Sequence, residues 1–225
     1  MELFAGSHSV SRAVRRCFGR LFDVRVLSVD LDPKSRPGVL ADINSWKYKG
    51  DIDAFLKGRK RSDIVAAWAS PPCTAFSIAN STGVRDIKGG SRNVKSGLRV
   101  MRYTRPHFWM VENPQGLLKE QPFMRKMKRY INTCSYCRYG TKYRKSSNIW
   151  SDVPDLHLKV CKGETQCEEK RRYGIHRVSA QKGPSGGIAV GSVSGRNVYG
   201  IPPRLVCHLF RRGLAHAVAK KRQRP

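Results

Sequence analysis

Long apolar runs and acidic side chains are what this sequence lacks most. It contains no run of about 18 apolar residues, so we expect no segment to cross a membrane. The N-terminal stretch MELFAGSHSV has neither a basic region nor an apolar signal core, so we expect an intracellular rather than a secreted protein. These absences argue against membrane-spanning proteins and against small secreted modules.

Acidic residues are few in this sequence, and basic residues are in large excess. Sixteen Asp and Glu and forty-four Lys and Arg leave a formal charge of +28 over 225 residues. A field of this strength predicts a polyanionic partner, because each neutralised phosphate releases condensed counterions. The alternative, a basic isoelectric point kept for solubility, needs far less charge. With 40% hydrophobic residues, the chain is still apolar enough for one sizeable core.

A regular cysteine framework is also absent. The seven cysteines are an odd number, and in a non-secreted chain we interpret them as thiols or metal ligands rather than disulfides. Several lie in an irregular stretch where CSYC offers two-residue ligand spacing. Because no second close Cys-x-x-Cys pair follows, free thiols are the first interpretation and zinc is the alternative. The best zinc ligand set is Cys137, Cys161, Cys167 and His176, since Cys134 has a more strand-like context.

Apolar segments of strand and helix character alternate through the first half of the chain. This alternation predicts an α/β fold with a doubly wound, mostly parallel sheet. Ser9 is expected to cap the first helix, and an amphipathic helix follows two prolines near the C-terminus. The expected strands cover 2–6, 24–29, 63–69 and 107–113, and the expected helices cover 9–21, 94–103 and 199–220.

Conspicuous polar residues stand where the expected strands end. Gly6, Asp30, Cys73 and Glu112 each follow or close an apolar segment. In open α/β sheets, ligands bind outside the carboxyl ends of the strands, so we expect these residues to share one site. Pro71 and Pro72 fix the backbone before Cys73, which is how a chain would present a nucleophilic thiol rather than bury it.

The same strand ends predict a nucleoside cofactor. Gly6 forms a turn before a helix, Asp30 lies where an acid takes ribose hydroxyls, and Asp42 could hold an adenine amino group. No complete G-x-G-x-x-G is present, because His8 stands where a second glycine is expected. This absence counts against a dinucleotide and favours S-adenosylmethionine. The alternative is that Asp30 and Asp42 merely cap loops.

Several stretches occur in the same order as in one enzyme family. They are ELFAGSHSVSRAV, SVDLDP, ADINSW, ASPPCTAFSIANSTGVRDI, FWMVENPQGLL, CRYGTKYRKSSNIW and, more loosely, YGIPPRL. With them the chain resembles the cytosine-C5 methyltransferases, particularly the compact kind of large DNA viruses and phages. Pro-Pro-Cys and Glu-Asn-Pro are specific as a pair, because amino-methyltransferases carry an Asn/Asp-Pro-Pro-aromatic element without cysteine.

The resemblance implies a role for each matching position. Cys73 would be the nucleophile, Glu112 would grip the target base, and Arg144 would be a basic group near the nucleotide. Cationic surroundings are expected to favour the Cys73 thiolate. The implied cofactor residues are Phe4, Ala5, Gly6, Ser7, His8, Asp30, Leu31, Asp42, Ile43 and Pro72, and the nucleic-acid contacts are Tyr143, Lys145, Arg171 and Arg172.

The resemblance also implies an organisation and an activity. We expect an S-adenosylmethionine-binding catalytic core at 1–130, a small basic region resembling a target-recognition part with a Gly/Ser-rich linker at 131–197, and a returning helix with a basic tail at 198–225. The expected enzyme is a monomeric DNA cytosine-5 methyltransferase, in the nucleus or cytoplasm of a host cell if it is viral. Two alternatives stay open, namely RNA methylation and a weakly active or inactive protein that only binds nucleic acid.

Overall fold

The computed structural model describes residues 1–78, 83–162, 166–178 and 200–222, and contains one seven-stranded sheet in the order β3-β2-β1-β4-β5-β7-β6. Neighbouring strands from β3 to β5 are parallel, whereas β7 is antiparallel to both β5 and β6. This confirms the expected α/β fold with a mostly parallel sheet. The strands are β1 (Glu2–Leu3), β2 (Ser28–Asp30), β3 (Val39–Leu40), β4 (Ala66–Ala69), β5 (Phe108–Pro114), β6 (Ile131–Ser135) and β7 (Ser146–Ser151).

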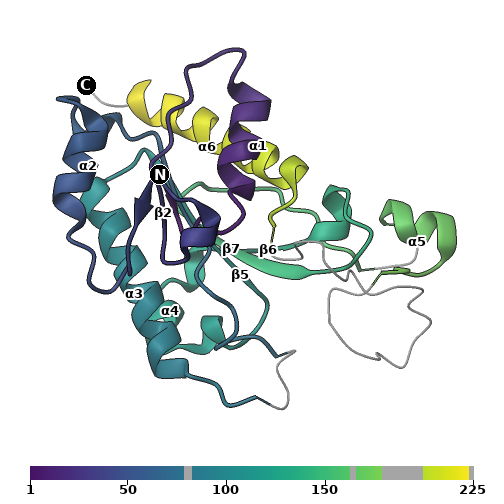
Figure 1. The fold of residues 1–225 in the computed structure, drawn as a ribbon. Helices are drawn as coiled ribbons and strands as arrows, with labels where there is room; N and C mark the ends of the chain where they lie inside the picture. Colours follow the sequence, from purple (N-terminus) through teal and green to yellow (C-terminus); the bar gives the residue numbers. More distant parts are fainter. Residues whose placement is uncertain (79–82, 163–165, 179–199, 223–225) are drawn as a thin grey trace.

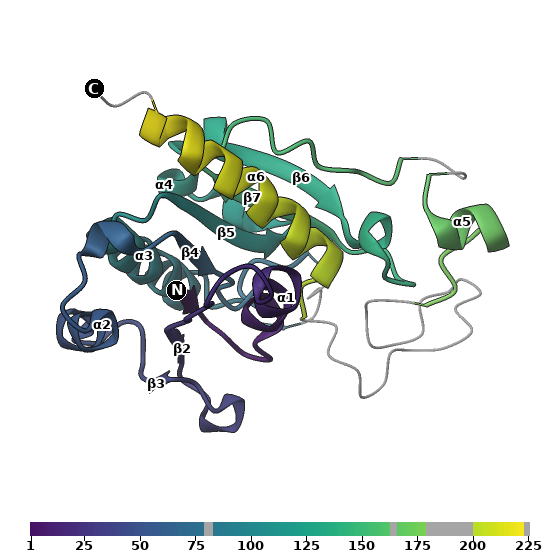
Figure 2. The same cartoon turned by 90° about the horizontal axis from the view of Figure 1, so that it is seen from above.

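Helices cover both faces of this sheet (Figure 1). Helices α1 and α6 pack together on one face, and Figure 2 shows α6 running across the strands beside α1. Helices α2, α3 and α4 lie on the other face, and the short helix α5 lies apart, near the β6 end. The helices are α1 (Ser9–Phe18), α2 (Tyr48–Leu56), α3 (Ile87–Thr104), α4 (Pro122–Arg125), α5 (Glu168–Tyr173) and α6 (Pro203–Arg222).

Successive strand residues feed two separate cores, because side chains alternate across a sheet. On β4, Ala67 and Ala69 join the core beneath α2 and α3, while Trp68 joins the core beneath α1 and α6. Val111 and Met110 of β5 divide in the same way. Both faces are therefore buried, as a doubly wound sheet requires. Among the described helices, none is both long and apolar enough to cross a membrane.

The first helix is capped differently from the prediction. Ser9 does not cap it; the Ser9 hydroxyl instead accepts a hydrogen bond from the Ile201 N–H at 3.0 Å, which ties the C-terminal segment to the first loop. The buried Glu2 carboxylate accepts the N–H groups of Val10 and Ser11 at 3.3 and 3.1 Å, satisfying donors that a helix start leaves unpaired. Burial raises the pKa of Glu2 despite these bonds.

Several predicted boundaries were wrong. The first helix ends at Phe18, before Gly19, so Leu21 is exposed rather than part of its apolar face. The second strand is Ser28–Asp30, so only residues 28 and 29 of the expected 24–29 belong to it. Beyond residue 130 the sheet continues through β6 and β7, which the sequence did not reveal. The predicted Gly/Ser-rich linker and the last residues of the basic tail lie outside the described residues.

One cysteine pair contradicts the interpretation of all seven cysteines as thiols or metal ligands. Cys17 of α1 and Cys207 of α6 form a disulfide, with their Cα atoms 6.1 Å apart. The two cysteines are 190 residues apart in the chain, so only the packing of α1 against α6 brings them together. Sequence spacing carries no sign of such a contact.

Candidate active site at the switch point of the sheet

A cavity of about 330 Å³ opens at the carboxyl ends of the central strands. The strand order reverses between β1 and β4, and ligands of open α/β sheets bind at such a point. All the implied cofactor residues except His8 line the cavity, as do Cys73 and Glu112. They are Phe4, Ala5, Gly6, Ser7, Asp30, Leu31, Asp42, Ile43 and Pro72.

The loop after β1 is held in unusual backbone conformations. Phe4, Gly6 and His8 have φ of 57°, 45° and 55°, in the left-handed region that costs a non-glycine residue about 1 kcal/mol or more. The loop is fixed by the N–H of Gly6, which donates to Asp30 Oδ2 at 2.7 Å. The His8 ring turns away from the cavity to bond the Ser35 carbonyl oxygen at 2.7 Å. A strained histidine thus occupies the position where a second glycine was expected.

The side chains that line the cavity fit a nucleoside that carries a charged amino-acid part. Asp30 receives the N–H groups of Gly6 and Asp32 on different oxygens, which aims its carboxylate along the cavity wall. Asp42 is held in turn by Asn44, whose N–H and side-chain amide both donate to Asp42 Oδ1. A β-carbon on Gly97 would lie 3.2 Å from Phe4 Cε2, so this glycine makes room for the aromatic ring. Two acids that can accept hydrogen bonds from hydroxyl and amino groups, Asp30 and Asp42, therefore lie beside the flat apolar ring of Phe4.

The loop that carries Cys73 is tied to the neighbouring strand. The side-chain amide of Asn113 on β5 donates to the Pro71 carbonyl oxygen at 2.9 Å. After Cys73 the chain turns at once, because its carbonyl oxygen accepts the N–H groups of Phe76 and Ser77. Cys73 is thus partly exposed in the cavity wall rather than buried in the core. The loop and the strand that carries Glu112 form one rigid unit.

Glu112 is buried and has a partner that the sequence did not reveal. The Tyr136 hydroxyl donates to Glu112 Oε1 at 2.7 Å, and both residues are almost fully buried. Burial and the nearby carboxylate raise the pKa of Tyr136 well above its usual value, so it remains a proton donor. Lys145 lies over the Tyr136 ring, 4.9 Å from its centroid, and lines the cavity. No sequence signal marks Tyr136, which lies in the irregular stretch in a 3-10 turn, η5 (Tyr136–Tyr139).

The expected thiolate is not favoured in the free protein. Burial raises the pKa of Cys73, the positive charge of Lys145 lowers it, and Glu112 raises it further. Loss of hydration outweighs the single nearby cation, and a carboxylate opposes that cation. The prediction of a thiolate stabilised by cationic surroundings was therefore wrong for this state of the molecule.

Of the four expected nucleic-acid residues, only Lys145 lines the cavity, whereas Tyr143, Arg171 and Arg172 do not. The expected catalytic Arg144 also lies outside the cavity lining. Arg144 is instead near His176, because its charge, with burial and Lys170, lowers the pKa of that histidine. Arg171 and Arg172 are exposed on α5, and Tyr143 is half-buried beside the core under α6. Lys145, one residue beyond Arg144, is thus a basic group that lines the cavity together with Cys73.

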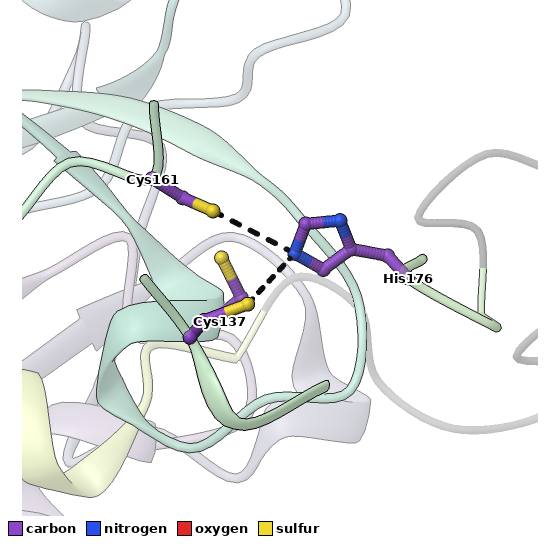
Figure 3. Close-up of side chains that lie close together, drawn as sticks. Cys137, Cys161 and His176 are labelled. Atoms are coloured by element: carbon purple, nitrogen blue, oxygen red, sulfur yellow. Dashed lines mark hydrogen bonds between the residues drawn. The ribbon is translucent and has the colours of Figure 1, made fainter. Parts of the chain in front are cut away.

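The four predicted metal ligands come together. Cys137, Cys161, Cys167 and His176 offer one ligand atom each, and these atoms all lie within 4.8 Å of one another. Figure 3 shows the side chains of Cys137, Cys161 and His176 converging on a common point. Cys134 is separate, buried in the core beneath α6, as its strand-like context predicted.

Three features define an enzyme of the methyltransferase class. They are the order of the strands in the sheet, the cavity at the switch point, and the acids Asp30 and Asp42 at the ends of the second and third strands. The model of the family "C-5 cytosine-specific DNA methylase" matches residues 1–147, and the chain belongs to this family. Membership confirms the resemblance seen in the sequence and the expected enzyme class, and it implies S-adenosylmethionine as methyl donor.

Two relatives show how far the similarity extends. A "Probable DNA (cytosine-5)-methyltransferase" of Frog virus 3 (isolate Goorha) is 26% identical over 93% of this chain and 97% of its own length. A solved "putative DNA modification methyltransferase encoded within prophage" of E. coli aligns with a TM-score of 0.52 and 17% identity. That alignment covers 72% of this chain, which spans about half (51%) of the prophage protein. The second likeness concerns the fold alone.

The raised pKa of Cys73 predicts how its reactivity depends on pH. Because only the thiolate is alkylated, the rate of Cys73 modification by iodoacetamide should rise with pH to a midpoint above that of an unperturbed cysteine peptide measured in parallel. Lys145→Gln should move the midpoint further up, and Lys145→Arg should leave it near the wild-type value. Peptide mass spectrometry separates Cys73 from the other cysteines. A midpoint below that of the peptide would contradict the assignment.

Proposed function

We propose that the chain transfers a methyl group from S-adenosylmethionine to carbon 5 of cytosine in DNA, through a covalent adduct on Cys73. The observation that carries the proposal is that Cys73 and Glu112, from adjacent strand ends, line the same cavity as Asp30 and Asp42. A thiol, a base-gripping carboxylate and a nucleoside site in one cavity are the parts that this reaction needs. The same geometry would have little purpose in a protein that only binds nucleic acid.

The loop and the two acids hold the methyl donor. Asp30 binds the ribose hydroxyls, Asp42 and Ile43 the adenine, and the Phe4 ring stacks on the base. The turn at Gly6 admits the methionine part beside the start of α1. When bound, S-adenosylmethionine supplies an electrophilic methyl group on a sulfonium. The protein's task is to make an unreactive ring carbon attack that methyl group.

Cys73 activates the cytosine by addition. Its thiolate forms a bond to carbon 6, and the electrons of the 5,6 double bond make carbon 5 nucleophilic. Carbon 5 then attacks the methyl group, whose bond to the sulfonium sulfur breaks with the electron pair returning to that sulfur. A base removes the proton from carbon 5, and the double bond re-forms as the Cys73–carbon 6 bond breaks. A proton shared between Glu112 and ring N3, and a hydrogen bond from the exocyclic amine to Glu112, stabilise the negative charge that the addition places on the ring. Because the ring must reach Cys73 inside a cavity, the cytosine is flipped out of any duplex.

Tyr136 and Lys145 support this chemistry from beside Glu112 and Cys73. The Tyr136 hydroxyl donates to Glu112 Oε1, and the second lone pair of Oε1 and the whole of Oε2 remain for the base. Lys145 lowers the pKa of Cys73 against the effect of burial, and a bound nucleotide phosphate would also be attracted to it. The basic surface of the remaining chain holds the phosphate backbone, so we place the activity where nucleic acid is found within a cell.

Asp30→Ala should remove the methyl-donor site without disturbing the thiol. Losing two charge-assisted hydrogen bonds to ribose should weaken S-adenosylmethionine binding by about 100-fold, on the order of 3 kcal/mol. Isothermal titration calorimetry measures the affinity, and Asp53→Ala on an exposed part of α2 is the matched control. Unchanged affinity in Asp30→Ala would exclude the proposed cofactor site.

Cys73→Ala should abolish both the adduct and methyl transfer. Wild-type protein incubated with S-adenosylmethionine and DNA containing 5-fluorocytosine should form a denaturation-stable complex, because fluorine on carbon 5 blocks the release of Cys73. Cys134→Ala, which removes a thiol outside the cavity lining, should still form it. An RNA of the same sequence tests the alternative substrate. Tight DNA binding without adduct or methyl transfer on either polymer would overturn the proposal.

Tyr136→Phe should slow methyl transfer while leaving the cofactor site intact. A hydrogen bond to a charged group contributes about 1.5–3 kcal/mol, so the single-turnover rate should fall roughly 10- to 100-fold. S-adenosylmethionine affinity should stay unchanged. A rate equal to wild type would show that Tyr136 plays no part in positioning Glu112.

A further inference from the structure

Three buried cysteines form a small cluster separate from the two sheet cores. Cys137, Cys161 and Cys167 are 5%, 2% and 4% exposed, and they constitute a buried group of their own. His176 covers this group, with its Nε2 atom 3.2 Å from Cys167 Sγ and 3.9 Å from Cys161 Sγ. The methyl-transfer chemistry uses none of the four. Burying three thiols around one imidazole needs a separate explanation.

The spacing of the four atoms is that of a tetrahedral metal site. Zinc bonds of about 2.3 Å to sulfur and 2.0–2.1 Å to nitrogen place neighbouring ligand atoms about 3.5–3.8 Å apart. The ligand atoms here lie within 4.8 Å of one another, so small side-chain movements suffice. Figure 3 shows that the labelled cysteines and His176 reach this point from different segments. The arrangement is thus a cage and not a pair of chance neighbours.

From this geometry we infer that Cys137, Cys161, Cys167 and His176 bind one zinc ion as a structural site. Three sulfurs and one imidazole nitrogen form a donor set that suits zinc and disfavours calcium and magnesium, which take oxygen ligands. Four protein ligands fill a tetrahedral shell, so no position is left for water or substrate. The site therefore orders the chain and performs no chemistry.

The ion would join three segments that are separate in the sequence. Cys137 belongs to η5, the Cys161 N–H donates to Ser135 Oγ at 3.1 Å, and Cys167 stands at the start of α5. Helix α5 has only six residues, too few to be stable alone, and Glu169 is its one buried member. Metal ligation at both ends of this helix supplies the stability that a hydrophobic core would otherwise provide.

The proposed ion also lies next to the catalytic groups along the chain. Cys137 directly follows Tyr136, whose hydroxyl bonds Glu112, and the Tyr136 N–H donates to the Lys145 carbonyl oxygen at 2.9 Å. Fixing Cys137 therefore fixes the turn that positions Glu112. The same ion holds α5, so the exposed Arg171 and Arg172 stay at this end of the molecule. This inference concerns metal content and stands whether or not the methyltransferase proposal holds.

The test is the metal content of the full chain purified from zinc-supplemented cells without chelator. Elemental analysis by mass spectrometry should find about one zinc ion per chain. Cobalt exchanged into the site should give the visible absorption bands of tetrahedral coordination and a thiolate charge-transfer band in the near ultraviolet. Cys161→Ser and His176→Ala should reduce zinc to near zero. His176→Cys should retain it, because a fourth thiolate completes the shell.

The matched control is Cys134→Ala, which removes another buried cysteine and should leave zinc at wild-type content. Circular dichroism checks that each variant keeps its sheet, so that a loss of metal cannot result from unfolding. If Cys161→Ser fails to fold, the test relies on His176→Ala, because His176 is only half-buried. Wild-type protein without zinc and without a tetrahedral cobalt spectrum would overturn the inference. So would zinc that survives in both Cys161→Ser and His176→Ala.

Discussion

The hydrogen bond from the Asn113 side chain to the Pro71 carbonyl oxygen is the contact on which the site depends most. It joins the loop of the thiol to the strand of the carboxylate, and both partners lie just beyond the residues that pair β4 with β5. Because Pro71 and Pro72 restrict the loop and a buried amide anchors it, Cys73 has little freedom relative to Glu112. Catalysis by addition to a ring needs such fixed geometry, since misplacement of reacting atoms by about 1 Å costs large factors in rate.

Residues at strand ends were predictable because the rule behind them is local. An apolar run that ends in a polar residue marks the carboxyl edge of a parallel sheet, and Asp30, Cys73 and Glu112 obey it. The Glu-Asn-Pro stretch also pointed to Asn113, although only the structure shows that its amide reaches the Pro71 carbonyl oxygen. Likewise the sequence identified Cys137, the two later cysteines and His176 as the set that the fold brings together, although Cys134, the other cysteine of CSYC, lies apart.

Contacts across the chain and the balance of electrostatic effects were not predictable. Tyr136 meets Glu112 because β6 and β7 extend the sheet beyond β5, and neither strand has a clear pattern in the sequence. The net charge of +28 suggested a stabilised thiolate, yet burial and one carboxylate outweigh Lys145 at Cys73. Total charge describes the distant field, whereas a pKa depends on the few groups within about 4–6 Å and on lost hydration.

A raised pKa at the nucleophile is consistent with the proposed chemistry rather than opposed to it. In the proposed chemistry, a partly buried thiolate beside the Glu112 carboxylate would be costly in the free protein, so the thiol stays protonated until substrate arrives. A flipped cytosine held by Glu112 would reduce the repulsion that this carboxylate exerts on Cys73, because its charge would then be shared with the base. Lys145 would remain as the favourable neighbour. On this view the site forms its nucleophile only when the base is in place, which limits side reactions of the thiol in a cell.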